Sequence, residues 1–77
     1  MERIKGWLEI VDDYGEHKYT VIKIEKGSYY FAEKNLYGNM LRYNEKRGMI
    51  EEAQPVTHFW DVWSAYIYQA TFVRRLK

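Results

Sequence analysis

The sequence predicts an α+β fold in which a five-stranded antiparallel β-meander packs against one C-terminal α-helix. Gly15, Gly27, Gly38 and Gly48 lie ten to twelve residues apart, each between β-like runs, as expected of a meander. Residues 57–75, in contrast, contain no Gly, Pro or Asn and carry six of the fourteen aromatic residues. The meander is therefore assigned to residues 1–54 and the helix to residues 57–75, within a single domain spanning residues 1–77.

The first predicted strand, residues 4–11, alternates apolar residues with Lys5, Trp7 and Glu9. Gly6 in this run indicates a β-bulge. The following Asp-Asp-Tyr-Gly sequence, residues 12–15, predicts a type I turn closed by a left-handed glycine. The first two strands are therefore expected to form a hairpin.

The second strand is expected at residues 18–26, which are rich in β-branched side chains. Lys26-Gly27 supplies a tight turn, and further strands are predicted at residues 28–34, 40–44 and 49–53. Residues 45–48, Glu-Lys-Arg-Gly, have the turn chemistry of the first hairpin, and Pro55 ends the sheet.

The helix prediction rests on side chains that share a face. At about 100° per residue, eight apolar or aromatic residues fall within an arc of roughly 160°, the width of a core-facing stripe. Thr57 is an acceptable N-cap. An alternative of one or two strands stays open, because Val, Thr, Tyr and Trp are indifferent helix formers. The predicted core-facing residues are Phe59, Trp60, Val62, Trp63, Tyr66, Ile67, Ala70 and Val73.

The predicted architecture is a meander that wraps the helix or closes into an SH3-like or OB-like half-barrel. In element order alone it is similar to the small archaeal chromatin proteins, which also place a C-terminal helix on a five-stranded sheet. That resemblance is one of fold and implies no shared function.

Composition excludes several classes of protein. The chain has no Cys, so it has no disulfide framework and no thiolate chemistry, which fits a reducing compartment. No secretory signal and no membrane-spanning stretch are expected, so we predict a cytoplasmic location, or the host-cell cytosol if the protein is viral. The net charge is +1, and the basic excess lies at Arg74, Arg75 and Lys77. This is a weaker basic field than dedicated nucleic-acid binders carry.

Candidate catalytic and metal-binding residues are few. His17 and His58 each have an acidic neighbour, but a metal site needs three or four converging ligands. Ser28 follows Lys26-Gly27 without the upstream glycine spacing of a phosphate-binding loop, and Ser64 is expected on the polar face of the helix. We therefore expect no catalytic residues, no metal and no cofactor, and predict that the protein is not an enzyme.

The surplus of aromatic residues is the feature that bears most on function, because fourteen rings are hard to bury in so small a core. Tyr, Trp, Met and Arg are enriched in interface cores, which predicts a protein-binding module that acts by surface occlusion, a type of inhibitor or adaptor that viruses and mobile elements use. Tyr68 and Phe72, spaced i, i+4 on the outer helix face, would also suit a homo-oligomer seam. The predicted partner-binding residues are Trp7, Tyr14, Tyr37, Met40, Tyr68 and Phe72.

A nucleic-acid-binding sheet is the alternative function. Basic and aromatic residues alternate along several predicted strands, so rings would stack on bases while cations meet phosphates. Interspersed acidic residues such as Glu9, Glu25 and Glu33 weaken the positive field. The residues predicted for this alternative are Arg3, Lys5, Trp7, Tyr19, Lys23, Tyr29, Arg42 and Tyr43.

Overall fold

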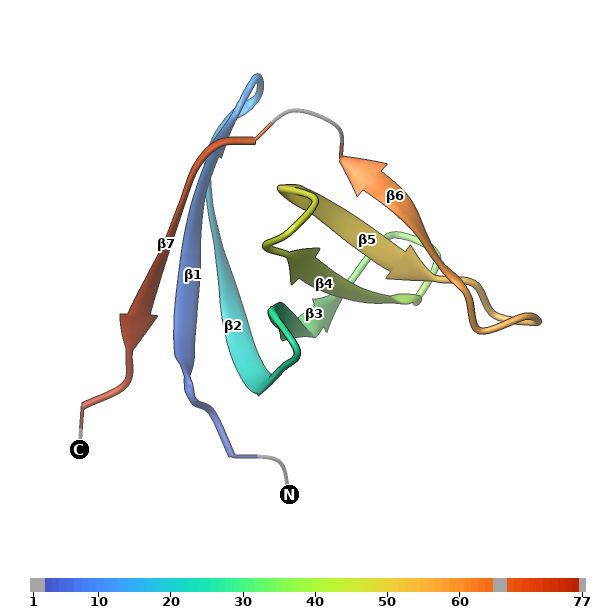
Figure 1. Ribbon diagram of the computed structural model, residues 1–77, viewed down its shortest axis with the longest axis horizontal. Helices are drawn as coiled ribbons and strands as arrows, with labels where there is room; N and C mark the ends of the chain where they lie inside the picture. Colours follow the sequence, from blue (N-terminus) through green and yellow to red (C-terminus); the bar gives the residue numbers. More distant parts are fainter. Residues whose placement is uncertain (1–2, 65–66, 77) are drawn as a thin grey trace.

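The computed structural model describes residues 3–64 and 67–76, and these contain seven β-strands in one antiparallel sheet. The first six strands follow one another as a meander, and the last crosses over to pair with the first, giving the order β6-β5-β4-β3-β2-β1-β7 (Figure 1). The strands are β1 (Gly6–Asp12), β2 (Gly15–Glu25), β3 (Ser28–Lys34), β4 (Met40–Asn44), β5 (Met49–Ala53), β6 (Trp60–Ser64) and β7 (Ile67–Arg74).

The sheet curls around its own core. In Figure 1, β7, β1 and β2 stand on one side of the molecule while β4, β5 and β6 cross the other side. Side chains on the inner face meet between these two halves, and each full burial of an aliphatic or aromatic side chain contributes roughly 1.5–3 kcal/mol. The buried hydrophobic residues in the described part of the chain are Leu8, Ile10, Val21, Phe31, Leu41 and Ile50.

Local turn chemistry fixes the meander. Lys26 and Gly27 both have positive φ angles, of 50° and 79°, and they separate the paired residues Glu25 and Ser28. This is the two-residue type I′ geometry, whose twist matches that of the flanking strands. Lys26 adopts the left-handed conformation at a cost that the hairpin offsets.

The predicted C-terminal helix is wrong. The part of residues 57–75 that the structure describes forms β6 and β7, and the structure has no helix within residues 3–64 and 67–76. His58 has a φ of 61°, the left-handed region, so a right-handed helix cannot run through it. β7 pairs residue by residue with β1, from Gly6 opposite Arg74 to Val11 opposite Gln69. The α+β class, the half-barrel wrapped around a helix and the likeness to archaeal chromatin proteins are corrected accordingly.

Because the helix prediction is wrong, several predictions of which side chains are buried and which are exposed are wrong too. Phe59, Val62 and Trp63 were expected in the core, but all three are exposed. Phe72 was expected on the outer face, but it packs against the buried cluster opposite Leu8. Ile67 and Ala70 do pack against the core, as strand residues rather than helix residues. Tyr66 and Lys77 lie outside the described residues.

Gly6 lies in close contact with the backbone of β7. A Cβ atom at this position would lie 2.2 Å from the carbonyl oxygen of Val73, and the φ of Gly6 is +156°. Only glycine permits this approach, so the glycine that predicted a bulge marks a close backbone contact with the last strand. Across residues 3–64 and 67–76, no helix is long and apolar enough to span a membrane.

Candidate functional site

The loop between β3 and β4 is held by Asn35. Its side-chain oxygen accepts hydrogen bonds from the backbone N–H groups of Tyr37 (3.0 Å) and Asn39 (2.9 Å). Two backbone bonds close the same loop, from Asn35 N–H to the Asn39 carbonyl and from Gly38 N–H to the Asn35 carbonyl. Such Asx-type bonding fixes a turn without apolar packing. Leu36 and Tyr37 at its tip are 95% and 78% exposed.

A second set of bonds ties this loop to the end of β5. The side-chain amides of Asn35 and Asn39 both donate to Glu52, the Asn39 bond measuring 3.3 Å. Glu52 lies opposite Leu41 in the β4–β5 pair, near the end of β5, so its carboxylate reaches the β3–β4 loop that precedes β4. The β3–β4 loop is therefore anchored beside the start of the β5–β6 loop.

The β5–β6 loop is closed by its own backbone. Gln54 N–H donates to the Phe59 carbonyl (2.7 Å), and His58 N–H donates to the Gln54 carbonyl (3.0 Å). These bonds turn the intervening side chains outward, and Val56 and Phe59 are 85% and 70% exposed. In Figure 1 the β5–β6 loop extends to the right of the molecule, and the β3–β4 loop lies behind β5 toward the same side. We call Leu36, Tyr37, Val56 and Phe59 the apolar loop patch.

The outer face of the sheet carries a buried carboxylate. Glu51 is only 1% exposed, and its oxygens accept hydrogen bonds from Arg42 Nε (2.7 Å) and Arg47 Nη1 (2.9 Å), with Asn44 Nδ2 at 3.4 Å. A buried charge is tolerated when opposite charges and donors satisfy it in this way. The cluster joins β4 to β5, and its hydrogen-bonding capacity is used within the protein.

Arg42 also packs against two aromatic rings that contact each other edge to face. Its guanidinium is 4.2 Å from the Trp60 ring centroid and 5.6 Å from that of Tyr30, and it donates to the Tyr30 hydroxyl at 3.1 Å. Lys23 lies 5.0 Å from the Tyr30 centroid, and Lys18 lies 4.3 Å from the Trp7 centroid. Cations placed over ring faces satisfy both partners. A nucleic-acid base would have to displace them before it could stack.

The residues predicted for nucleic-acid binding are divided between two faces. Tyr19, Tyr29 and Tyr43 pack against the core, and Tyr19 stacks on Phe31 with ring centroids 4.5 Å apart. Burial raises the pKa of all three tyrosine hydroxyls. The others lie on the outer face of the sheet or in the exposed segment before β1, namely Trp7, Lys23 and Arg42, and Arg3 and Lys5.

The residues predicted for partner binding are scattered. Tyr14 in the β1–β2 turn is 91% exposed, and Tyr37 belongs to the apolar loop patch. Met40 begins β4 and is partly exposed, and Trp7 is half-buried beneath Lys18. Tyr68 is exposed and donates a hydrogen bond to Asp13, which raises its pKa. Phe72 faces the core. Of these six residues, only Tyr37 lies in the patch.

The sequence alone did not point to Leu36 and Val56 as candidate binding residues, and it led us to predict that Phe59 faces the core. The available signal was the position of apolar residues among turn formers. Leu36 and Tyr37 lie between Asn35 and Gly38, and Val56 follows Pro55. Apolar side chains inside a turn have no strand face to bury them, so they point to solvent.

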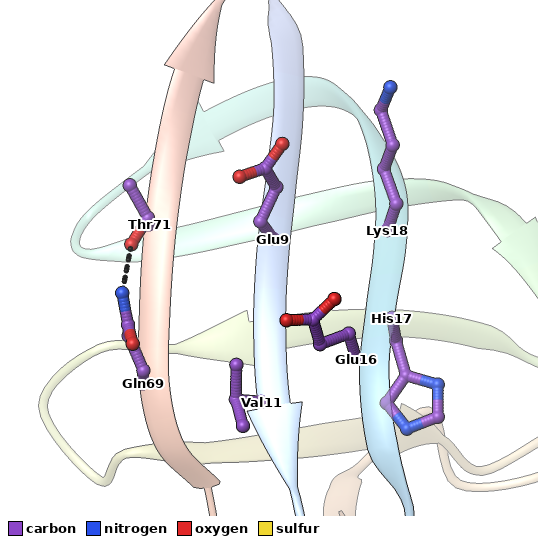
Figure 2. Close-up of a pocket in the computed structure, with 7 residues that line it drawn as sticks. All are labelled: Glu9, Val11, Glu16, His17, Lys18, Gln69 and Thr71. Carbon is purple, nitrogen blue, oxygen red and sulfur yellow. Dashed lines mark hydrogen bonds between the residues drawn. The ribbon is translucent and has the colours of Figure 1, made fainter.

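A depression of about 440 Å³ lies over β7, β1 and β2 (Figure 2). Glu9, Glu16 and Lys18 contribute charges of both signs, and Gln69 donates to the Thr71 hydroxyl at 3.3 Å. The side chains of Glu9, Glu16, Lys18, Gln69 and Thr71 in this depression are exposed to solvent. Within the part of the chain that the structure describes, no three metal-ligating side chains converge.

His17 pairs with Asp12 rather than with a metal-binding set. Its Nε2 lies 3.0 Å from Asp12 Oδ1, beside the β1–β2 turn. Burial alone would raise the pKa of Asp12, but hydrogen bonds from Tyr14 N–H and from His17, together with the charge on His17, bring it below its usual value of 3.8. The pair therefore holds the turn. His58 is exposed in the β5–β6 loop.

Comparison with known proteins adds no relative from which a function can be transferred. No protein-family model, no curated protein and no solved structure matches the chain. The candidate site is therefore argued from its own geometry.

Proposed function

We propose that this protein is a small protein-binding module that recognises its partner through the apolar loop patch. One observation carries the proposal. Leu36, Tyr37, Val56 and Phe59 are each at least 70% exposed, yet they stand on two loops that backbone and Asn side-chain hydrogen bonds hold in place. Large apolar side chains cost free energy in water, and their grouping on a surface is typical of interaction sites.

The fixed loops favour tight binding. Binding costs free energy when loops and side chains must be ordered, and loops that are already closed by hydrogen bonds avoid much of that cost. Tyr37 and Phe59 supply aromatic rings, and tyrosine is enriched among the residues that dominate interface energies. A module that covers a working surface of its partner in this way would act as an inhibitor or an adaptor.

Nucleic-acid binding gains less support from the geometry. Tyr19, Tyr29 and Tyr43 face the core, and the rings of Trp7, Tyr30 and Trp60 are covered by Lys or Arg side chains. The net charge of +1 gives a weak field for phosphates. A protein partner is accordingly the better fit to the exposed surface.

The test is affinity capture from a lysate of the native host cells, with and without nuclease. The Tyr37→Ser/Phe59→Ser variant removes two rings of the patch, whereas Tyr14→Ser removes an even more exposed ring from the β1–β2 turn. We expect the wild type and Tyr14→Ser to capture the same protein. The double variant should bind it at least tenfold more weakly, because hot-spot residues contribute about 2 kcal/mol or more each.

Both variants change exposed side chains, so thermal unfolding should show each to be folded like the wild type. Undiminished capture by the double variant would refute the patch as the binding site. Loss of all captured material on nuclease treatment would refute a protein partner in favour of a nucleic acid.

A further inference from the structure

The strand β7 leaves one row of its backbone groups unpaired by any strand that the structure describes. Its only described partner is β1, on the other side. The Arg75 N–H donates to the Lys5 carbonyl at 3.0 Å, and bonded pairs recur at every second residue of an antiparallel ladder. Val73, Thr71 and Gln69 therefore bond to β1. Within the regular part of the pairing, the alternate residues Ala70 and Phe72 direct their N–H and C=O groups to the open edge.

From Gln69 to Val73, this edge lacks the features that protect edge strands. Natural sheets guard their edges with Lys, Pro, inward charges, bulges or very short strands. The segment from Ile67 to Val73 contains no charged residue and no proline. Its pairing with β1 shifts register between Ile67 and Gln69 and is regular from Gln69 to Arg74. The opposite edge, β6, is a five-residue strand with Asp61 near its middle. β7 is thus the edge open to strand addition.

The sequence of β7 is complementary to itself. If a second β7 lies antiparallel to the first with Ala70 opposite Ala70, Tyr68 meets Phe72 and Gln69 meets Thr71. Ile67 then meets Val73. Each pair matches aromatic with aromatic, polar with polar and aliphatic with aliphatic, and opposed residues point to the same face of the sheet. Such matching satisfies a two-fold interface, where one patch must fit its own copy.

We propose that two copies of this chain associate edge to edge through β7, antiparallel about a two-fold axis at Ala70. The two copies of Ala70 exchange main-chain hydrogen bonds at the axis, Phe72 of each copy continues the pairing toward the start of the other β7, and the two sheets become one. The cationic residues Arg74 and Arg75 of the two copies lie at opposite ends of the paired strands, so they do not face each other. The interface is separate from the apolar loop patch, and its existence does not rest on the proposed function.

The first test is the mass in solution, measured by light scattering over a wide concentration range. We expect the wild type to approach twice the 9.4 kDa of one chain. Ala70→Pro removes a donor that faces the open edge and leaves the β1–β7 bonds intact, so this variant should remain monomeric. Ala70→Val keeps the N–H group and should still dimerise. A monomeric wild type at millimolar concentration, or a dimer unaffected by Ala70→Pro, would overturn the proposal.

The second test keeps the proposal falsifiable if Ala70→Pro fails to fold. The natural chain has no cysteine, so a single introduced thiol reports only on contact between copies. Directly opposed residues of an antiparallel pair have Cα atoms about 5.5 Å apart or less, within disulfide range. Ala70→Cys should give a covalent dimer on mild oxidation, and Gln69→Cys should give far less. Equal or reversed yields would rule out the two-fold axis at Ala70.

Discussion

Glu51 is the residue whose surroundings differ most from those of an ordinary surface acid. It is buried on the outer face of the sheet, where Arg42 and Arg47 hold its two oxygens. Removing one partner of a buried ion pair leaves the other charge without compensation. The cluster therefore stabilises the β4–β5 hairpin only while it is complete.

A substitution at this residue should be costly. We expect Glu51→Gln to lower the free energy of unfolding by about 3 kcal/mol, because Arg42 loses its charged partner in a partly buried place. Glu25→Gln is the matched control, since Glu25 pairs with Lys23 at 3.5 Å with both side chains about half exposed, and it should cost under about 0.5 kcal/mol. Urea unfolding of the two variants measures the difference, and similar losses would contradict this account of Glu51.

Asp12 gives the fold a pH dependence. Its pKa lies below 3.8 in the folded protein, so the ionised carboxylate stabilises the native state above the unfolded pKa. That contribution is lost as the pH falls through the lowered folded pKa. We expect Asp12→Asn to melt at a lower temperature than the wild type near pH 7, and the difference in Tm to shrink as the pH falls through the folded pKa of Asp12. A difference that persists unchanged in acid would show that the Asp12 charge is not responsible.

At the scale of elements, local chemistry predicted the first five strands well. The strands expected at residues 28–34, 40–44 and 49–53 coincide with β3, β4 and β5, and Lys26-Gly27 forms the tight turn. Each of these signals depends on a few neighbouring residues. The bulge predicted at Gly6 is wrong, because Gly6 pairs in register with Val21 and with Arg74. A glycine is needed there because the carbonyl of Val73, in a strand far away in sequence, comes so close.

The last third of the chain could not be predicted in this way. This segment has so many aromatic and apolar residues that some of them share one helical face whether or not a helix forms. Its β-branched and aromatic residues also suit strands. The deciding interaction is the pairing of β7 with β1, such as Phe72 opposite Leu8, which no local period encodes. The prediction of the candidate site missed Phe59 for the same reason, because Phe59 was assigned to the buried face of the predicted helix.

The contact at Gly6 can be tested as a property of the β1–β7 pair. Gly6→Ala places a methyl group against the Val73 carbonyl, and we expect a loss of about 3 kcal/mol with faster hydrogen exchange in β7. Gly38→Ala also has a positive φ, of 79°, but meets no atom within 4 Å, so it should cost only about 1–2 kcal/mol. Thermal unfolding and amide exchange compare the two. Equal losses without a change in β7 would contradict the close approach.

At the scale of the whole molecule, a single curled sheet forms the core and carries the loops of the apolar loop patch. The core is small, and the inner-face residues Phe72 and Tyr29 are only half-buried. The loops at one side are free to carry apolar side chains because hydrogen bonds from Asn35 and Gln54, rather than packing, hold them. A dimer joined through β7 would present two apolar loop patches, and linked sites bind a multivalent partner more tightly than one site does.

Both proposals require that the C-terminal residues form edge strands, because a helix would bury Phe59 and remove the open edge of β7. Nuclear Overhauser effects between α-protons test this requirement most directly. In the pairing described here, Leu8 with Phe72 and Ile10 with Ala70 are the closely spaced, non-hydrogen-bonded pairs, with Cα atoms about 4.5 Å apart. We expect strong α-proton contacts for both pairs. Consecutive amide–amide contacts through residues 60–74, with neither cross-strand contact, would contradict the account.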